Sequence, residues 1–343
     1  MVETTNEDAT ECKLSAVNCG YYEDEFLKFF VPENRRKNRK PPLINRGHFA
    51  RVAAVDCVIR RFIERGGKQV VVLGAGYDTT YFRLGKERRE GVAWFEIDFP
   101  NVISTKISTI ERNAELRHAV GDVEPADVVG DGSVKQWKSC EGTMTIAGTD
   151  IRNTTQVEMI LKASGIEWNE PTMIISEVVL VYIEPKSADE IISWAAKKFQ
   201  TAVFVTYEQI RPKDAFGAMM VKNLEARGCP LLGIHAYPDL PAQEARYTLH
   251  GWQKSKAIDM NSVFTQLISS TPGMAKRLSS IEIFDELEEW NLIQAHYCFV
   301  ISIIEQQHHH HQESFWGSQI SPKFEVRLDL PESVTSRKKL PLA

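Results

Sequence analysis

Short apolar runs alternate with amphipathic stretches along most of the chain. Runs rich in β-branched residues predict strands over residues 68–73, 92–97, 143–147, 172–176, 202–207 and 295–304. Apolar residues at helical spacing predict helices over residues 45–65, 101–117, 154–163, 188–199, 216–227 and 281–290. This alternation indicates an α/β protein with a mostly parallel sheet, whose binding crevice lies at the carboxyl ends of the strands.

The pattern also suggests where the folded domain begins. Residues 1–12 are polar, and we expect a mobile N-terminus. Residues 13–66 are mixed in character and predict a helical N-terminal extension. The folded domain is therefore expected to span residues 13–304, although residues 121–142 are too polar and glycine-rich to assign.

Two later segments depart from the alternation. Residues 228–259 contain Pro230, Pro238 and Pro241, which favour an insertion or lid over a core element. Residues 305–343 are low in aliphatic side chains, which predicts a tail without a fixed fold. The histidine run 308–311 in this tail is more typical of low-complexity sequence than of a metal site.

The most specific motif follows the first strand. The run 68–73 leads into Gly74-Ala75-Gly76, and the second strand ends in Asp98, 24 residues after Gly74. Such a glycine turn lets a nucleotide approach the backbone, and an acid at the next strand end can accept hydrogen bonds from ribose hydroxyls. Taken alone, Gly-x-Gly is also compatible with a plain strand-to-helix turn, but the spacing to Asp98 favours a nucleotide site.

The type of nucleotide follows from what the motif lacks. Thr79 stands where a dinucleotide fingerprint has its third glycine, and no Gly-Lys-Ser/Thr follows the turn. The motif therefore suits an adenosine cofactor without phosphates, of which S-adenosylmethionine is the common one. Asp150 and Glu177 follow or end two further predicted strands, so four candidate residues converge on one sheet edge: Gly74, Asp98, Asp150 and Glu177.

Composition excludes several other classes. The formal net charge of −5 gives no general attraction to nucleic acid or anionic membrane. No apolar run is long enough to span a bilayer, and the polar N-terminus does not read as a signal peptide. The six cysteines show no C-x-x-C spacing, which argues against a zinc site and for a reducing compartment. We therefore expect a cytoplasmic protein without a metal.

In six segments that occur in the same order, the chain resembles leucine carboxyl methyltransferases. The segments are INRGHFARVAAVD (44–56), VLGAGYDTTYFRL (72–84), WFEIDFP (94–100), SEVVLVYIEP (176–185), VTYEQIRPKDAFGAMMVKNL (205–224) and GWQKSKAIDM (251–260). The resemblance implies a class I S-adenosylmethionine-dependent methyltransferase fold, Rossmann-like with an antiparallel last strand. It also implies methylation of the C-terminal leucine of the catalytic subunit of protein phosphatase 2A.

The resemblance assigns roles to individual residues. Arg51 matches an arginine that holds the methionine carboxylate of the cofactor, although on its own pattern it reads as a surface charge. Glu177 matches the acid beside the aminopropyl group, and Asp98 the ribose acid. The remaining matched cofactor positions are Lys13, Gly74, Asp150 and Ile151. His48 and Asn153 depart from the family, which has a tyrosine and an acid there.

The implied chemistry needs no general base, because an α-carboxyl group with a pKa of about 3.5 is already ionised at cellular pH. The enzyme must instead align and desolvate a carboxylate and a sulfonium, and such orientation can supply about 7–11 kcal/mol. We expect hydroxyl or backbone donors at the substrate carboxylate. Tyr182 and Tyr207, near the ends of two strands, are candidates, and both can equally be edge-of-core tyrosines.

Two other functions remain open. One is the related carboxyl methyltransferase that forms wybutosine in transfer RNA, which the negative net charge disfavours. The other is a non-catalytic module that binds the cofactor and acts only as a chaperone of the phosphatase. We expect a monomer that acts on a protein partner and binds neither nucleic acid nor membrane.

Overall fold

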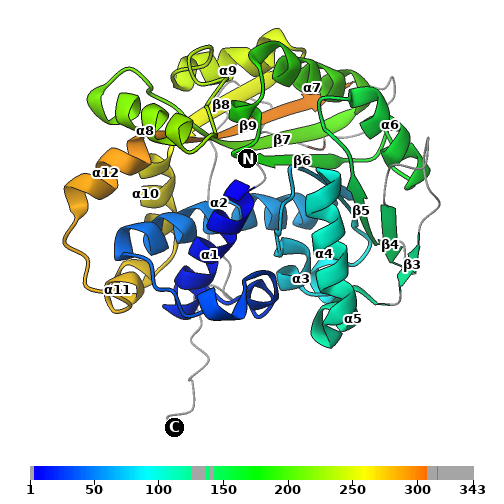
Figure 1. The fold of residues 1–343 in the computed structure, drawn as a ribbon. Helices are drawn as coiled ribbons and strands as arrows, with labels where there is room; N and C mark the ends of the chain where they lie inside the picture. The colour runs from blue at the N-terminus through cyan, green and yellow to red at the C-terminus, as the bar shows by residue number, and fades with distance from the viewer. Residues whose placement is uncertain (1–3, 122, 126–135, 140–142, 307–314, 316–343) are drawn as a thin grey trace.

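The computed structural model describes residues 4–121, 123–125, 136–139, 143–306 and 315 of the 343-residue chain. Within this part, nine strands form one sheet in the order β3-β4-β5-β2-β1-β6-β7-β9-β8. Figure 1 shows β3 and β4 on one side of the sheet and β8 and β9 on the other. The strands are β1 (Gln69–Leu73), β2 (Ala93–Asp98), β3 (Val123–Pro125), β4 (Gln136–Ser139), β5 (Met144–Gly148), β6 (Thr172–Glu177), β7 (Thr201–Gln209), β8 (Lys254–Asp259) and β9 (Tyr297–Glu305).

The centre of the sheet is parallel and its two sides are antiparallel. Strands β5, β2, β1, β6 and β7 run parallel, whereas β9 is antiparallel to β7 and β8. All six predicted strands are present, and the expected antiparallel last strand is confirmed as β9. Strands β3 and β4, in the segment that the sequence left unassigned, pair antiparallel at the other side.

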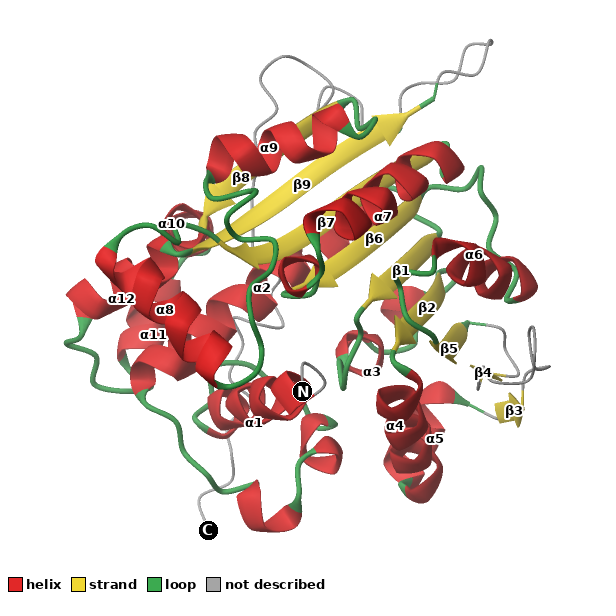
Figure 2. Ribbon diagram, turned by 45° about the horizontal axis from the view of Figure 1, so that its top comes forward, coloured by secondary structure: helices red, strands yellow, loops and turns green. Residues whose placement is uncertain are grey.

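Helices cover both faces of the sheet (Figure 2). They are α1 (Thr4–Asn18), α2 (Pro42–Glu64), α3 (Thr80–Leu84), α4 (Pro100–Arg112), α5 (Ala114–Val120), α6 (Thr154–Ala163), α7 (Pro185–Lys198), α8 (Ala215–Ala226), α9 (Leu240–Leu249), α10 (Met260–Ser270), α11 (Met274–Ser279) and α12 (Leu287–Ala295). A short 3-10 turn, η4 (Leu180–Tyr182), follows β6.

The central strand β1 shows why its sequence is a continuous apolar run. Val70 and Val72 belong to the core shared with α2, α4 and α10, whereas Val71 and Leu73 belong to the core shared with α6, α7 and α9. Successive side chains of a strand point to opposite faces, so a strand covered by helices on both sides needs apolar residues at every position. All five residues of β1 are buried accordingly.

The N-terminus differs from its prediction. Residues 4–12, expected to be mobile, form the first part of α1. This helix is weakly amphipathic, so its periodicity gave no signal. Its polar side chains nevertheless have partners: Tyr77 donates its backbone N–H to Asn6 Oδ1 at 2.9 Å, and Asp8 pairs with Arg227 on the far side of the site. Contacts with distant segments hold this helix in place.

The lid prediction is wrong for most of its length. Residues 240–249 form α9, and residues 254–259 form β8, an edge strand on β9. Tyr247 and Trp252 pack against Phe204 in the core. Pro230 and Pro238 lie in loops, and Pro241 lies in the first turn of α9. The backbone N–H that a proline lacks would have no partner within the helix at that position. Only residues 228–239 retain the character of a loop beside the site.

Smaller differences concern the C-terminal third. The last helix before β9 spans residues 287–295 rather than 281–290, and α10 and α11 precede it without having been predicted. Most of the predicted tail, including the histidine run 308–311, lies outside the described residues. Phe315 is described, and its ring packs against Phe62 with centroids 5.9 Å apart. In the described part of the chain, no helix is both long and apolar enough to cross a membrane.

Candidate active site

A cavity of about 530 Å³ lies at the carboxyl ends of the parallel strands, a size suited to a small-molecule ligand. Following the strand order, Asp150 comes after β5, Asp98 ends β2, Gly74 follows β1 and Glu177 ends β6. The cavity wall also includes the other matched positions and both tyrosine candidates: Lys13, Arg51, Ile151, Tyr182 and Tyr207. The structure thus brings every predicted site residue together, while their roles in binding stay predictions.

The glycine turn is constrained by protein neighbours. Gly74 and Gly76 have φ angles of +72° and +51°, which strain residues with side chains. A Cβ at Gly74 would lie 2.4 Å from Val179, and one at Gly76 would lie 2.4 Å from Asn6 Oδ1. Val179 and Asn6 therefore occupy the space that a Cβ would need, while both glycines also line the cavity, and a nucleotide beside them stays a prediction.

Two backbone hydrogen bonds fix the Asp98 carboxylate next to the glycine turn. Its Oδ2 accepts the backbone N–H of Gly76 at 2.6 Å, and its Oδ1 accepts that of Phe99 at 2.6 Å. The carboxylate therefore ties the glycine turn to the end of β2 and faces the cavity.

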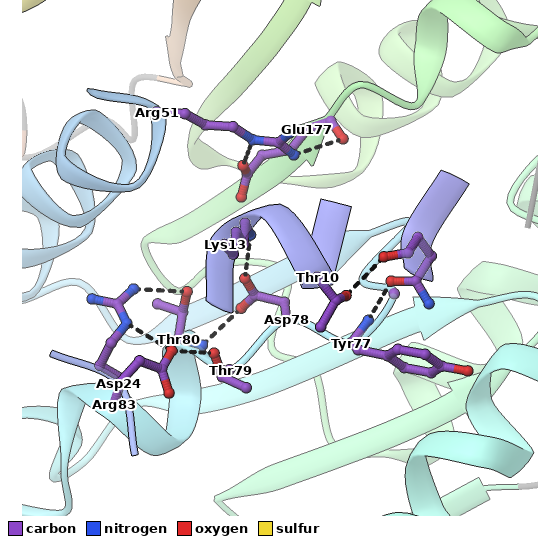
Figure 3. Close-up of polar contacts among 12 residues, drawn as sticks. Thr10, Lys13, Asp24, Arg51, Tyr77, Asp78, Thr79, Thr80, Arg83 and Glu177 are labelled. Atoms are coloured by element: carbon purple, nitrogen blue, oxygen red, sulfur yellow. Dashed lines mark hydrogen bonds and ion pairs between the residues drawn. The ribbon is translucent and has the colours of Figure 1, made fainter. Parts of the chain in front are cut away.

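Arg51 and Glu177 form the central ion pair of the cavity (Figure 3). Arg51 Nε lies 2.5 Å from Glu177 Oε2, and the guanidinium sits over the ring of Tyr207 at 4.9 Å. The Tyr207 ring in turn stacks on Tyr297, with centroids 5.2 Å apart. Burial alone would lower the pKa of Arg51, but the Glu177 carboxylate raises it, so the guanidinium stays charged.

A buried acid, Glu208, stabilises the turn that follows Glu177. Glu208 accepts backbone N–H groups from Val179, Leu180 and Val181 at 3.1–3.4 Å. This clamp fixes a turn in which Val178 has a φ angle of +57°, unusual for a β-branched residue. Burial raises the pKa of Glu208 to about 7.

A second charged cluster supports the glycine turn. Lys13 Nζ lies 3.4 Å from Asp78 Oδ2 (Figure 3), and Lys106 donates to the Asp78 carbonyl at 2.7 Å. Burial alone would raise the pKa of Asp78, but the ammonium groups of Lys13 and Lys106 lower it to about 2. Lys106 also pairs with Glu96 at 2.5 Å, and both of these side chains are completely buried.

Sequence reasoning missed Asp78, which lines the cavity, and the buried pair Glu96–Lys106 that supports it. A signal for Lys106 exists, since it falls between Val102, Ile103 and Ile110 on the apolar face of α4. A lysine on such a face needs a buried partner. The partner itself could not be read from the sequence, because Glu96 lies on a different element.

The two departures from the family pattern have different surroundings. Asn153 Oδ1 accepts the backbone N–H of Gln156 at 3.1 Å, so Asn153 is the N-cap of α6. His48 lines the cavity from α2, one helical turn before Arg51. Burial and the nearby charge of Arg51 lower its pKa to about 3, so the imidazole is neutral. Within the described ranges, no group of three potential metal ligands occurs.

Comparisons with known proteins agree with this arrangement. A family model described as leucine carboxyl methyltransferase matches residues 2–196. The chain is 38% identical over 305 residues to the leucine carboxyl methyltransferase 1 homolog of Arabidopsis thaliana, covering 88% of this chain and 89% of that protein. It is 37% identical over 306 residues to tRNA wybutosine-synthesizing protein 4 of Homo sapiens, covering 86% of this chain but 43% of that protein.

Among solved structures, a putative methyltransferase from Thermobifida fusca is similar with a TM-score of 0.48 and 12% identity, covering 77% of this chain and 84% of that one. The strand order and the family match confirm the expected class I methyltransferase fold, with a mostly parallel sheet and an antiparallel last strand. The family match, the full-length relatives and the cavity at the strand ends lead to one conclusion. The chain belongs to the leucine carboxyl methyltransferase family and is an S-adenosylmethionine-dependent carboxyl methyltransferase.

Proposed function

We propose that this enzyme methylates the α-carboxylate of the C-terminal leucine of the protein phosphatase 2A catalytic subunit, in the cytoplasm. The observation that carries the proposal is the cavity at the strand ends, which the matched cofactor positions line in a chain 38% identical to a leucine carboxyl methyltransferase 1 homolog. The only histidine of this cavity within the described residues, His48, is neutral with a pKa of about 3 and is too weak a base to deprotonate a substrate at cellular pH. Such a cavity suits an acceptor that arrives already ionised.

The residues along the sheet edge suit S-adenosylmethionine. Asp150 and the apolar Ile151 would flank the adenine, and Asp98 would accept hydrogen bonds from the ribose hydroxyls. Gly74 and Lys13 lie next along the edge, and the Arg51–Glu177 pair would hold the charged amino-acid end. Arg51 uses its Nε on the Glu177 carboxylate, which leaves further N–H groups for a second carboxylate.

When bound beside Asp98, Arg51 and Glu177, the cofactor would supply an electrophilic methyl group to the ionised acceptor, so that no proton would have to be transferred. The residues of the chain orient and desolvate the two partners. Tyr207, packed between Arg51 and Tyr297, holds the wall of the cavity rigid. α1 contributes Asn6 and Lys13 to the wall and limits access of water from that side.

The protein partner has to be recognised by more than its last residue, because many proteins end in a free carboxylate. Leu224 of α8 and Leu232 of the 228–239 loop line the cavity and lead to the surface. The basic segment 33–40 is a further candidate for this rim. However, Lys40 and Arg35 face Glu11, and Arg39 pairs with Glu282, so much of its charge is already used within the chain.

The test is transfer of a labelled methyl group from S-adenosylmethionine to three acceptors. These are the intact folded phosphatase subunit, the subunit without its final leucine, and transfer RNA carrying the wybutosine precursor. We expect labelling of the intact subunit alone, as a base-labile ester. Labelling of the transfer RNA alone would assign the other activity found in the family, and cofactor binding without labelling of any acceptor would favour the non-catalytic chaperone.

A further inference from the structure

The cavity extends beyond the residues assigned to the cofactor. In the sheet order, β7 and β9 follow β6 on the side away from β2. Gln209 ends β7 and Tyr297 begins the antiparallel β9, so both stand at the same sheet edge as Glu177. His48 of α2 and Gln294 of α12 also line this end. The cofactor residues leave it unassigned, and it adjoins the Arg51–Glu177 pair.

The cations of the cavity are already engaged. Within the described residues, four lysine or arginine side chains line it, and each forms an ion pair. The pairs are Lys13–Asp78, Arg51–Glu177, Arg152–Asp150 and Arg227–Asp8. A substrate carboxylate therefore meets no unpaired cation here. This favours the reaction, because a cation bound tightly to the carboxylate would reduce its nucleophilicity.

Several neutral polar groups of the cavity, in contrast to its cations, lack a partner. His48 Nδ1, Gln209 Oε1 and Gln294 Oε1 are buried and have no hydrogen-bond partner among the described residues. A buried polar atom without a partner costs about 1–3 kcal/mol, and such atoms are rare in folded proteins. Three of them at one end of a cavity indicate a polar ligand there.

Gln294 and His48 are placed to act together. A Cβ on Gly47, the residue before His48, would lie 3.4 Å from Gln294 Nε2, so the glutamine amide lies against this turn of α2. Gln294 is only 2% exposed. The orphaned Oε1 of Gln294 is an acceptor, so this residue can serve a carboxylate only through its Nε2, after rotation of the amide group. His48 can serve it through Nδ1 in the tautomer that carries the proton there. His48 stays uncharged in this role, because burial and Arg51 keep its pKa far below cellular pH.

The same end of the cavity has an aliphatic wall. Leu43 and Ile44 lie on α2 one turn before His48, and Ile293 precedes Gln294 on α12. A polar pair beside three aliphatic side chains matches the last residue of a peptide that ends in leucine, with one carboxylate and one branched apolar side chain.

We propose that His48 and Gln294 hold the reacting α-carboxylate as neutral hydrogen-bond donors, and that Leu43, Ile44 and Ile293 receive the terminal leucine side chain. This assignment rests on the proposed function and specifies its acceptor subsite. Gln209 acts as a positioning residue, since it stands opposite Tyr297 in the β7–β9 pairing, and Tyr297 stacks on Tyr207.

The test is a binding measurement with S-adenosylhomocysteine present at saturation. Two peptides are compared that share the phosphatase tail sequence, one ending in free leucine and the other in leucinamide. The wild-type enzyme should prefer the free acid by about tenfold or more, as expected for hydrogen bonds to a charged group. Gln294→Leu and His48→Phe should each lose most of this preference and keep the affinity for S-adenosylmethionine within about twofold.

Gln243 offers a matched control. It is also a buried glutamine whose Oε1 has no partner among the described residues, but it lies on α9 and does not line the cavity. Gln243→Leu should retain the preference for the free acid. A separate variant, Ile293→Ala, should reduce discrimination between peptides that end in leucine and in alanine while leaving the acid-over-amide preference intact.

Outcomes for the subsite and for the proposed function are distinguishable. The subsite is disproved if the wild-type enzyme does not prefer the acid, or if Gln294→Leu and His48→Phe keep that preference. Should either variant fail to fold, Gln294→Glu gives the same answer through repulsion of the substrate carboxylate. A clear acid preference without methyl transfer to the leucine would instead reject the proposed function and leave the subsite standing.

Discussion

Arg51 Nε and Glu177 Oε2 lie 2.5 Å apart, although 126 positions separate the two residues in the sequence. The pair joins α2 to the end of β6, and its side chains are only 12% and 15% exposed. Both charges are therefore largely removed from water, so each depends on the other for compensation. This contact ties the N-terminal extension to the sheet at the centre of the site.

Glu177→Gln should lower the free energy of unfolding by about 3 kcal/mol, because it leaves the Arg51 guanidinium buried without a counter-charge. It should also weaken binding of S-adenosylmethionine. Urea unfolding and calorimetry measure the two effects. The double variant Arg51→Met/Glu177→Gln should cost less than the sum of the single changes, and strict additivity would show that the pair contributes no coupling energy.

Gly74→Ala should destabilise the protein through its positive φ angle and through overlap with Val179, each costing about 1–3 kcal/mol. Val179→Ala in the same chain should recover the part that is due to overlap, since the nearest contact is with the Val179 methyl groups. Thermal unfolding of the two single variants and the double variant measures this. If Gly74→Ala lowers stability by the same amount with and without Val179→Ala, the whole loss comes from the backbone conformation.

The buried pair Glu96–Lys106 should make stability depend on pH. Burial raises the folded-state pKa of Glu96 to about 7, above its ordinary value of 4.5. Between these values the folded state binds more protons than the unfolded state, so this group's contribution to stability decreases as pH rises from about 4.5 to 7. Lys106→Met should cost about 3–5 kcal/mol at neutral pH.

Without the ammonium group of Lys106, the pKa of Glu96 should rise further, so the loss of stability should continue above pH 7. Urea unfolding from pH 5 to 8 of Lys106→Met and of Lys106→Met/Glu96→Gln tests this, and the second variant removes the titrating group. If both variants show the same pH dependence, Glu96 is not responsible for it.

Glu208→Ala should loosen the turn that carries Glu177 and Tyr182, because three backbone N–H groups lose their acceptor. We expect faster hydrogen exchange at Val179, Leu180 and Val181 and at least about tenfold weaker binding of S-adenosylmethionine. Glu208→Gln keeps one acceptor oxygen and should be milder on both measures. Unchanged exchange at these three amides in Glu208→Ala would show that the strand ends hold the turn without the carboxylate.

The sequence alone determined the features that depend on runs of neighbouring residues. The central strands follow from short β-branched runs, and the order in which Gly74, Asp98, Asp150 and Glu177 meet at one edge follows from their places at strand ends. A parallel sheet brings all its carboxyl ends to one side, so local signals suffice for this much. The roles of Lys13 and Arg51 came from resemblance to a family, because their local pattern gave no indication of a site.

Tertiary structure decided what depends on contacts between distant segments. α1 has little amphipathic pattern and is held by Tyr77 and Arg227, so its first residues gave only the impression of a polar terminus. β8 is a strand because β9 offers it an edge, and its own sequence is only partly buried. His48 and Gln294 line the same cavity only because α12 packs against α2. Residues far apart in sequence become partners only after the core has formed, which is why their pairing could not be read from the chain.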